Sequence, residues 1–166
     1  MKRREIFFYS GPGLKLEGGL CLPEDGGDGG AQIPAIVLCA GPGTGRGPSL
    51  SDLHHSPKVS RRLTEAGYAV LTFHYRGVGG SEGPLYRLMP LEMAADIRSA
   101  ITFLSQQPEV DTSRLGLWGA TTGGANVSHV AGVDARVKCT VSVSGIGDLG
   151  RWQREVRRYW EWCDLL

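Results

Sequence analysis

The sequence lacks the features that define several large classes of protein. No apolar run among the 166 residues approaches the roughly 20 needed to cross a bilayer. The apolar stretch at residues 6–9, after the basic start of the chain, is too short for the core of a signal peptide. Lys and Arg number 18 against 17 Asp and Glu, so no excess charge favours nucleic acid. We therefore expect a cytoplasmic protein that binds neither nucleic acid nor membrane.

Paired cysteines and clustered metal ligands are also absent from the sequence. Four cysteines are scattered along the chain, with no C-x-x-C pair and no histidines at zinc spacing: Cys21, Cys39, Cys139 and Cys163. The glycine-rich run at 41–47 lacks the lysine of a phosphate-binding loop. We expect free thiols, no metal and no cofactor.

Glycine is plentiful, with 25 residues, and it punctuates a regular series of predicted elements. The pattern predicts a hairpin of two strands at 6–10 and 14–23, the second interrupted by Gly18 and Gly19. Apolar runs predict four buried strands, at residues 35–39, 69–73, 114–118 and 137–143.

Three helices are expected between the buried strands. They start at Pro57, Pro90 and Gly123, and the first two end at Gly67 and before Pro108. Alternation of strands and helices gives parallel pairing with right-handed crossovers. The predicted class is therefore α/β, with a twisted, mostly parallel sheet, flanking helices and an N-terminal antiparallel hairpin at one edge.

The strand at 114–118 runs directly into a glycine-flanked turn, Gly119-Ala120-Thr121-Thr122-Gly123-Gly124. A strand, a sharp turn and a helix form the context of the nucleophile elbow G-x-S-x-G. The turn lifts its central side chain to the top of the sheet, and the helix N-terminus offers backbone donors to an oxyanion. Thr121 occupies the central position.

At this point the chain resembles the α/β-hydrolase family, in the branch of dienelactone-hydrolase-like and X-prolyl-peptidase-like serine hydrolases. The resemblance is carried in order by residues 37–43, 67–77 with 80–83, and 115–119 with the turn. It implies that Thr121 stands at the nucleophile position and that backbone amides of Gly43, Thr44 and Thr122 form the oxyanion hole. The resemblance covers only the N-terminal portion of the proteins of that family.

Two departures from the family's pattern bear on activity. The family has Ser where this chain has Thr121, and a β-branched residue at the positive φ of an elbow is an outlier, so a relic turn without chemistry is the alternative. The family's oxyanion loop usually carries His before its Gly, where this chain has Ala40 and Gly41, so a plain strand-to-loop turn is an equal alternative.

The acid and histidine of the triad follow later strands in the family, and neither is present in this sequence. His54 and His55, in the loop after residue 39, are weak candidates for a base, and solvated loop histidines are the alternative. Asp148 is a weak candidate for the acid, with helix capping as the alternative. His129 is expected to pack against the sheet, about 12 Å along its helix from Thr121, and His74 to pack or cap a loop.

Residues 1–150 are expected to form a partial α/β-hydrolase core, and residues 151–166 the start of a lid or terminal helix. That helix carries an aromatic stripe at helical spacing, with a membrane-surface helix as the alternative. Without later strands, the strand at 137–143 is an exposed edge with an uncovered apolar face. We expect a homo-oligomer, or a second chain carrying the C-terminal half.

Three functions fit these residues. The first is a hydrolase or acyl transferase acting on a small-molecule ester, thioester or amide, with Thr121 as nucleophile. The second is a non-catalytic, hydrolase-like subunit that has lost its triad. The third is a non-hydrolytic catalyst, for example a cyclase, that uses the same pocket.

Overall fold

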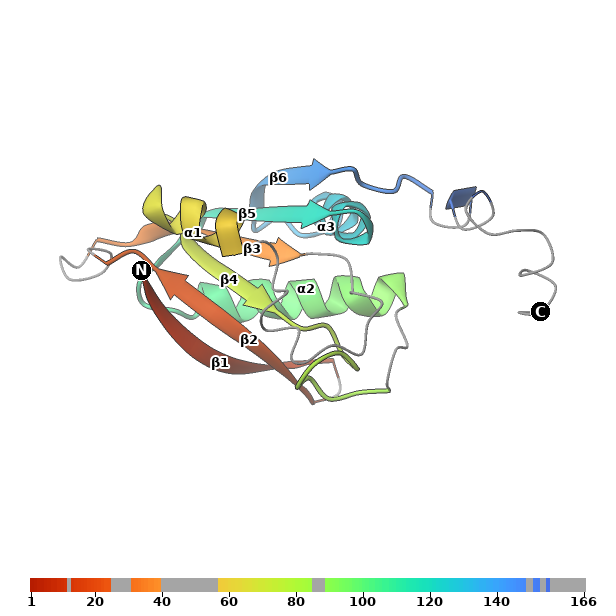
Figure 1. Ribbon diagram of the computed structural model, residues 1–166, viewed down its shortest axis with the longest axis horizontal. Coiled ribbons are helices and arrows are strands. Elements are labelled where there is room, and N and C mark those ends of the chain that lie inside the picture. Colours follow the sequence, from red (N-terminus) through yellow and green to blue (C-terminus); the bar gives the residue numbers. More distant parts are fainter. Residues whose placement is uncertain are drawn as a thin grey trace.

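The described residues of the computed structural model form six strands and three complete helices, in the order expected of an α/β protein (Figure 1). The structure describes residues 1–11, 13–24, 31–39, 57–84, 89–148, 151–152 and 155. The strands and helices are, in chain order, β1 Lys2–Ser10, β2 Leu14–Leu22, β3 Ile33–Cys39, α1 Pro57–Glu65, β4 Ala69–Phe73, α2 Pro90–Ser105, β5 Val110–Ala120, α3 Thr122–Val133 and β6 Val137–Val143.

The strands form one sheet in the order β1-β2-β4-β3-β5-β6. Strands β3, β4, β5 and β6 pair in parallel, whereas β1 and β2 form an antiparallel hairpin that joins the sheet through β4. The arrowheads of the four parallel strands point the same way (Figure 1). The predicted fold class is confirmed, and the carboxyl ends of these strands form one edge of the sheet.

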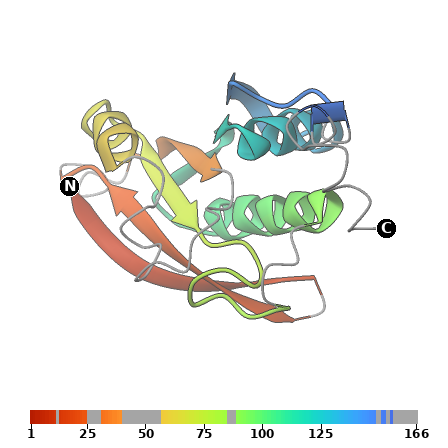
Figure 2. The ribbon, with the colours of Figure 1, turned by 45° about the vertical axis from the view of Figure 1, so that its right-hand side comes forward.

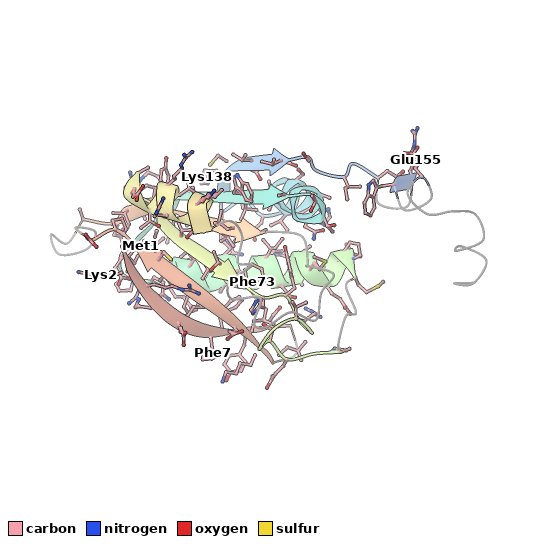
Figure 3. The ribbon with its side chains drawn as sticks, in the orientation of Figure 1. Met1, Lys2, Phe7, Phe73, Lys138 and Glu155 are labelled. Carbon is pink, nitrogen blue, oxygen red and sulfur yellow. The ribbon has the colours of Figure 1, made fainter. Side chains whose placement is uncertain are left out.

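Helices cover both faces of the sheet. Side chains of α1 pack with Leu38 and Val70 on one face. On the other face, α2 and α3 contribute to the larger core with Val37 and Leu71, whose side chains alternate with the first pair along the same strands. Figure 2 shows α2 and α3 side by side, away from α1. Phe73 lies inside this core, whereas Phe7 points outward from β1 (Figure 3).

Two glycines that were expected to interrupt the second strand lie inside it instead. β2 is continuous from Leu14 to Leu22, and Gly18 pairs with Phe73 of β4. An ideal Cβ on Gly18 would lie 2.6 Å from the carbonyl oxygen of Thr72, which is backbone. Glycine is needed here because the hairpin approaches β4 closely, so this part of the prediction was wrong.

β6 was expected to be a buried strand, and this is also wrong. Only Val137 is partly buried, and the remaining six residues of the strand are exposed. Val141 and Val143 are 50% and 43% exposed. β6 is the last strand of the sheet in the described residues, as the expectation of an exposed edge required. Its open backbone and valines are the kind of surface that pairs with further polypeptide.

Asp134, which ends α3, makes a cluster of charge-assisted hydrogen bonds. It accepts from Nε and Nη2 of Arg136 at 2.8 and 2.6 Å and from Nε of Arg98 at 3.3 Å. The hydrogen bonds from Arg136 lower the pKa of this carboxyl from 3.8 to about 2. The folded state therefore binds the proton more weakly than the unfolded chain does.

This pKa predicts acid sensitivity of a defined sign. The contribution of Asp134 to stability is complete above the unfolded value and is lost as the pH falls toward about 2. Urea unfolding of the parent and of Asp134→Asn should differ most near about pH 6, and the gap should narrow below about pH 4. A gap that stays constant over this range would contradict the assignment.

Candidate active site at the β5–α3 turn

The sharpest backbone feature of the molecule is the turn between β5 and α3. β5 ends at Ala120, α3 begins at Thr122, and Thr121 between them has φ 53° and ψ −118°. A β-branched residue rarely adopts positive φ, and such a conformation costs about 1–3 kcal/mol. The predicted strand, sharp turn and helix are therefore present, with Thr121 at the turn.

Glycines on both sides make this turn possible. A Cβ on Gly119 would overlap the carbonyl oxygen of Gly123 and lie 2.9 Å from the amide nitrogen of Gly124. A Cβ on Gly124 would lie 2.8 Å from the Cα of Gly145, in the segment after β6. The end of β5, the start of α3 and the segment after β6 therefore pack so closely that Gly119 and Gly124 have no room for a side chain. This explains the spacing of the glycines in the sequence.

Hydrogen bonds hold Thr121 at this position. Its backbone N–H donates to the carbonyl of Val143 at 3.0 Å, and its own carbonyl accepts from Ala125 at 3.2 Å. Its side chain is exposed, and Oγ1 donates to the carbonyl of Ala120 at 2.8 Å. The hydroxyl therefore donates its hydrogen bond to the neighbouring backbone carbonyl. To attack a substrate, it would have to break this bond and donate to a base instead.

The N-terminus of α3 supplies donors beside the hydroxyl. Thr122 is the first of the 12 helical residues, and the first four N–H groups of a helix have no acceptor within it. The aligned peptide dipoles add positive potential at this end. The start of α3 therefore carries unpaired donors and positive potential beside the Thr121 hydroxyl.

Arg76 and Asp96 fix the loop after β4, at the same edge of the sheet. Asp96 is fully buried on α2, and its Oδ1 accepts from Nη2 of Arg76 at 2.7 Å while Oδ2 accepts from the backbone N–H of Arg76 at 3.0 Å. Hydrogen bonds to Asp96 raise the pKa of the Arg76 guanidinium. This pair ties the exit of β4 to α2.

The other predicted site residues have different fates. Gly43, Thr44, His54 and His55 lie outside the described residues. Asp148 is exposed, and its Oδ1 accepts from the backbone N–H of Arg151 at 2.9 Å, so it caps the start of the terminal helix. Most of the predicted terminal helix also lies outside the described part of the chain, although Arg151, Trp152 and Glu155 are helical.

The two described histidines are not placed as bases. His74 is buried, and its Nδ1 lies 2.8 Å from Oε2 of Glu17, in the loop packing that was expected of it. His129 was expected to pack against the sheet, but it is exposed on α3. That helix is short and rich in small residues, so its sequence does not indicate which face is covered. It begins next to Thr121 and rises about 1.5 Å per residue, which carries His129 away from the turn.

Cys39 ends β3 at this edge but offers no second nucleophile. It is fully buried, and this burial raises the pKa of its thiol. The thiolate is the reactive form of cysteine, and it is disfavoured here. Among the described residues, no group of three His, Cys, Asp or Glu side chains could hold a metal ion. None of the described helices is long and apolar enough to cross a membrane.

Known proteins share this architecture. Residues 54–164 match the model of the prolyl oligopeptidase family. Over 134 residues the chain is 39% identical to an uncharacterized 31.7 kDa protein of Escherichia coli from the traX-finO intergenic region, covering 81% of this chain and 45% of that protein. Over 140 residues it is 35% identical to thiohydrolase aneE of Aspergillus aculeatus, covering 84% and 40% of the two chains. A hypothetical protein of Pseudomonas aeruginosa superimposes with TM-score 0.76 at 29% identity, over 87% of this chain and 43% of that chain.

The sheet order, the helices on both faces and the turn at Thr121 define the α/β-hydrolase fold. The chain belongs to the prolyl oligopeptidase family of that fold. This agrees with the resemblance found in the sequence. The chain spans less than half the length of the curated relatives that it matches.

Proposed function

We propose that this chain carries the nucleophile of an acyl-transfer site. The observation that carries the proposal is the strained backbone of Thr121, which presents a hydroxyl at the end of β5 and the start of α3. Strain of this kind persists where the surrounding structure enforces it, and it clusters at active sites. The substrate is a small molecule with an ester, thioester or amide bond, and the name of the related thiohydrolase supports a thioester.

In the proposed reaction, Oγ1 of Thr121 attacks the carbonyl carbon of the thioester. The O–C bond forms and the C–S bond breaks, and the hydroxyl proton passes through a base to the departing sulfur. The amide of Thr122, with those of Gly43 and Thr44, stabilises the oxyanion. The resulting acyl ester on Thr121 is then attacked by a second nucleophile. Attack by water releases the free acid, and attack by an acceptor molecule completes acyl transfer. Attack by a hydroxyl of the same acyl chain closes a ring.

The base and the acid complete the site from other parts of the molecule. His54 and His55 stay candidates for the base within this chain. Since Asp148 already caps a helix, we favour a histidine and an acid supplied by further polypeptide: a second copy or a second chain carrying the C-terminal half. The exposed valines and open edge of β6 suit such a contact.

A non-catalytic subunit is the second candidate function, and the side chain of Thr121 favours it. Its Oγ1 donates to the carbonyl of Ala120, and a β-branched residue is strained at the positive φ of this turn. A turn of this kind can survive as scaffold after chemistry is lost. The two functions differ in whether the hydroxyl reacts.

A fluorophosphonate distinguishes them, because it reacts with an activated hydroxyl and forms an O–P bond with loss of fluoride. We expect slow labelling of the parent chain, measured by intact mass. Thr121→Ser, which keeps the hydroxyl and removes the β-branch that is strained at positive φ, should label about tenfold faster or more.

The controls isolate the position. Thr121→Ala should not label, and Thr112→Ala, which removes an exposed threonine near the other end of β5, should label like the parent. If the parent and Thr121→Ser both stay unlabelled while folded, neither this chain nor a second copy of it supplies the base, and the scaffold function stands unless a second chain restores labelling.

A further inference from the structure

Ser144 shares an uncommon backbone conformation with Thr121. Among the described residues, eight have positive φ, and six of these are glycines. The two exceptions are Thr121 at 53° and Ser144 at 49°, and both carry a hydroxyl. The other positive-φ positions in the described residues hold glycine, which adopts this conformation without steric cost. The exceptions are therefore informative.

The two residues are neighbours in space. Ala120 is the register partner of Val143 in the parallel pair of β5 and β6, so Thr121 and Ser144 are the next residue on each strand. The N–H of Thr121 donates to the carbonyl of Val143 at 3.0 Å, which fixes this proximity. Adjacent strands lie about 4.8 Å apart, and the two backbones are separated by about that distance. Both residues are exposed at the carboxyl edge.

Packing explains the backbone at Ser144 but not its side chain. The chain turns sharply after β6 because Gly145 packs on Gly124, where an added Cβ would lie 2.8 Å from the Cα of Gly145. Glycine would satisfy this turn at lower cost. Within the described part of the chain, the hydroxyl of Ser144 makes no hydrogen bond that would repay the strain. The side chain is therefore left open beside Thr121.

Building on the proposed function, we propose that Ser144 binds the substrate and selects its acyl group. Its backbone lies about one strand spacing from that of Thr121, which puts its side chain within reach of an oxygen two or three atoms beyond the reacting carbonyl. The preferred substrates are acyl groups that carry a hydrogen-bonding oxygen at that position, such as 3-oxo or 3-hydroxy acyl chains. Simple alkanoyl groups lack this contact.

A matched pair of probes tests this selection. Hexyl fluorophosphonate is compared with its 2-oxohexyl analogue, in which the added oxygen stands where a 3-oxo group would. The ratio of labelling rates for the two probes cancels any change in the reactivity of Thr121. We expect this ratio to fall about fivefold in both Ser144→Ala and Ser144→Gly, the size of one hydrogen bond.

The stability of Ser144→Gly distinguishes a role of Ser144 in selecting the acyl group from a purely structural role. Ser144→Gly relieves the backbone strain, so its midpoint in urea should rise while the probe ratio falls. A purely structural serine would raise the midpoint in the same way but leave the ratio unchanged, and that result overturns the proposal.

A second readout keeps the two proposals apart. If neither probe labels the parent, Thr121 is not activated by this chain alone, and binding of the unreactive 2-oxohexylphosphonate and hexylphosphonate is measured by NMR titration. A preference for the oxo compound that is lost in Ser144→Ala still supports the role of Ser144. Equal affinities, or no binding, overturn it.

Discussion

Gly119→Ala is expected to destabilise the protein by about 3 kcal/mol and to abolish labelling at Thr121. The new methyl group would overlap the carbonyl oxygen of Gly123 and lie 2.6 Å from its carbonyl carbon. These are backbone atoms of the first turn of α3, so relief requires this turn to unwind. The turn that strains Thr121 and aims the helix donors would be lost with it.

Gly132→Ala is the matched control for this substitution. Gly132 lies near the end of the same helix, and a Cβ there meets nothing within 4 Å. Alanine is the better helix former, so this variant should be unchanged or more stable by up to about 1 kcal/mol. Urea unfolding measures both variants. A Gly119→Ala protein with the parent's midpoint and labelling rate would show that the turn does not depend on this close approach.

Asp96→Ala is expected to cost about 3–5 kcal/mol, because it leaves the guanidinium of Arg76 largely buried and without its partner. The carboxylate is fully buried and accepts from Nε, Nη2 and the backbone N–H of Arg76. It also accepts from the hydroxyl of Ser10 at 2.6 Å. A single substitution therefore removes the acceptor of four donor groups in the interior and releases the loop after β4.

An exposed ion pair and a double substitution serve as comparisons for Asp96→Ala. Asp111→Ala breaks an ion pair with Arg114 whose arginine side chain is 54% exposed, and it should destabilise the protein far less than Asp96→Ala does. Arg76→Met combined with Asp96→Leu should lose less than the sum of the two single changes, since neither charge is left unpaired. Additive losses in the double variant would contradict a coupled buried pair.

The architecture was predictable because its signals are local. The apolar runs of β3, β4 and β5 mark strands covered on both faces, and the glycines around Thr121 mark a turn too tight for side chains. The sequence of β6 alternates apolar and polar residues, which indicates a strand but not whether any other segment covers it. The prediction of its burial failed for that reason.

Parts of the candidate site were not predictable in this way. Ser144 was missed because a serine before a glycine is typical of any turn, and its positive φ arises only where Gly145 packs on Gly124. The covered face of α3 was missed because its small residues give no apolar stripe, so His129 was wrongly buried. Asp96 was missed as the partner of Arg76 because twenty residues separate them and only the packing of α2 joins them.

The most direct test of the central claim is the location of the phosphonate adduct on the unmodified chain, found by peptide mass spectrometry. The account predicts a single adduct on Thr121, at the junction of β5 and α3. An adduct on another hydroxyl and none on Thr121 would show that the turn is scaffold and that Thr121 is not the nucleophile.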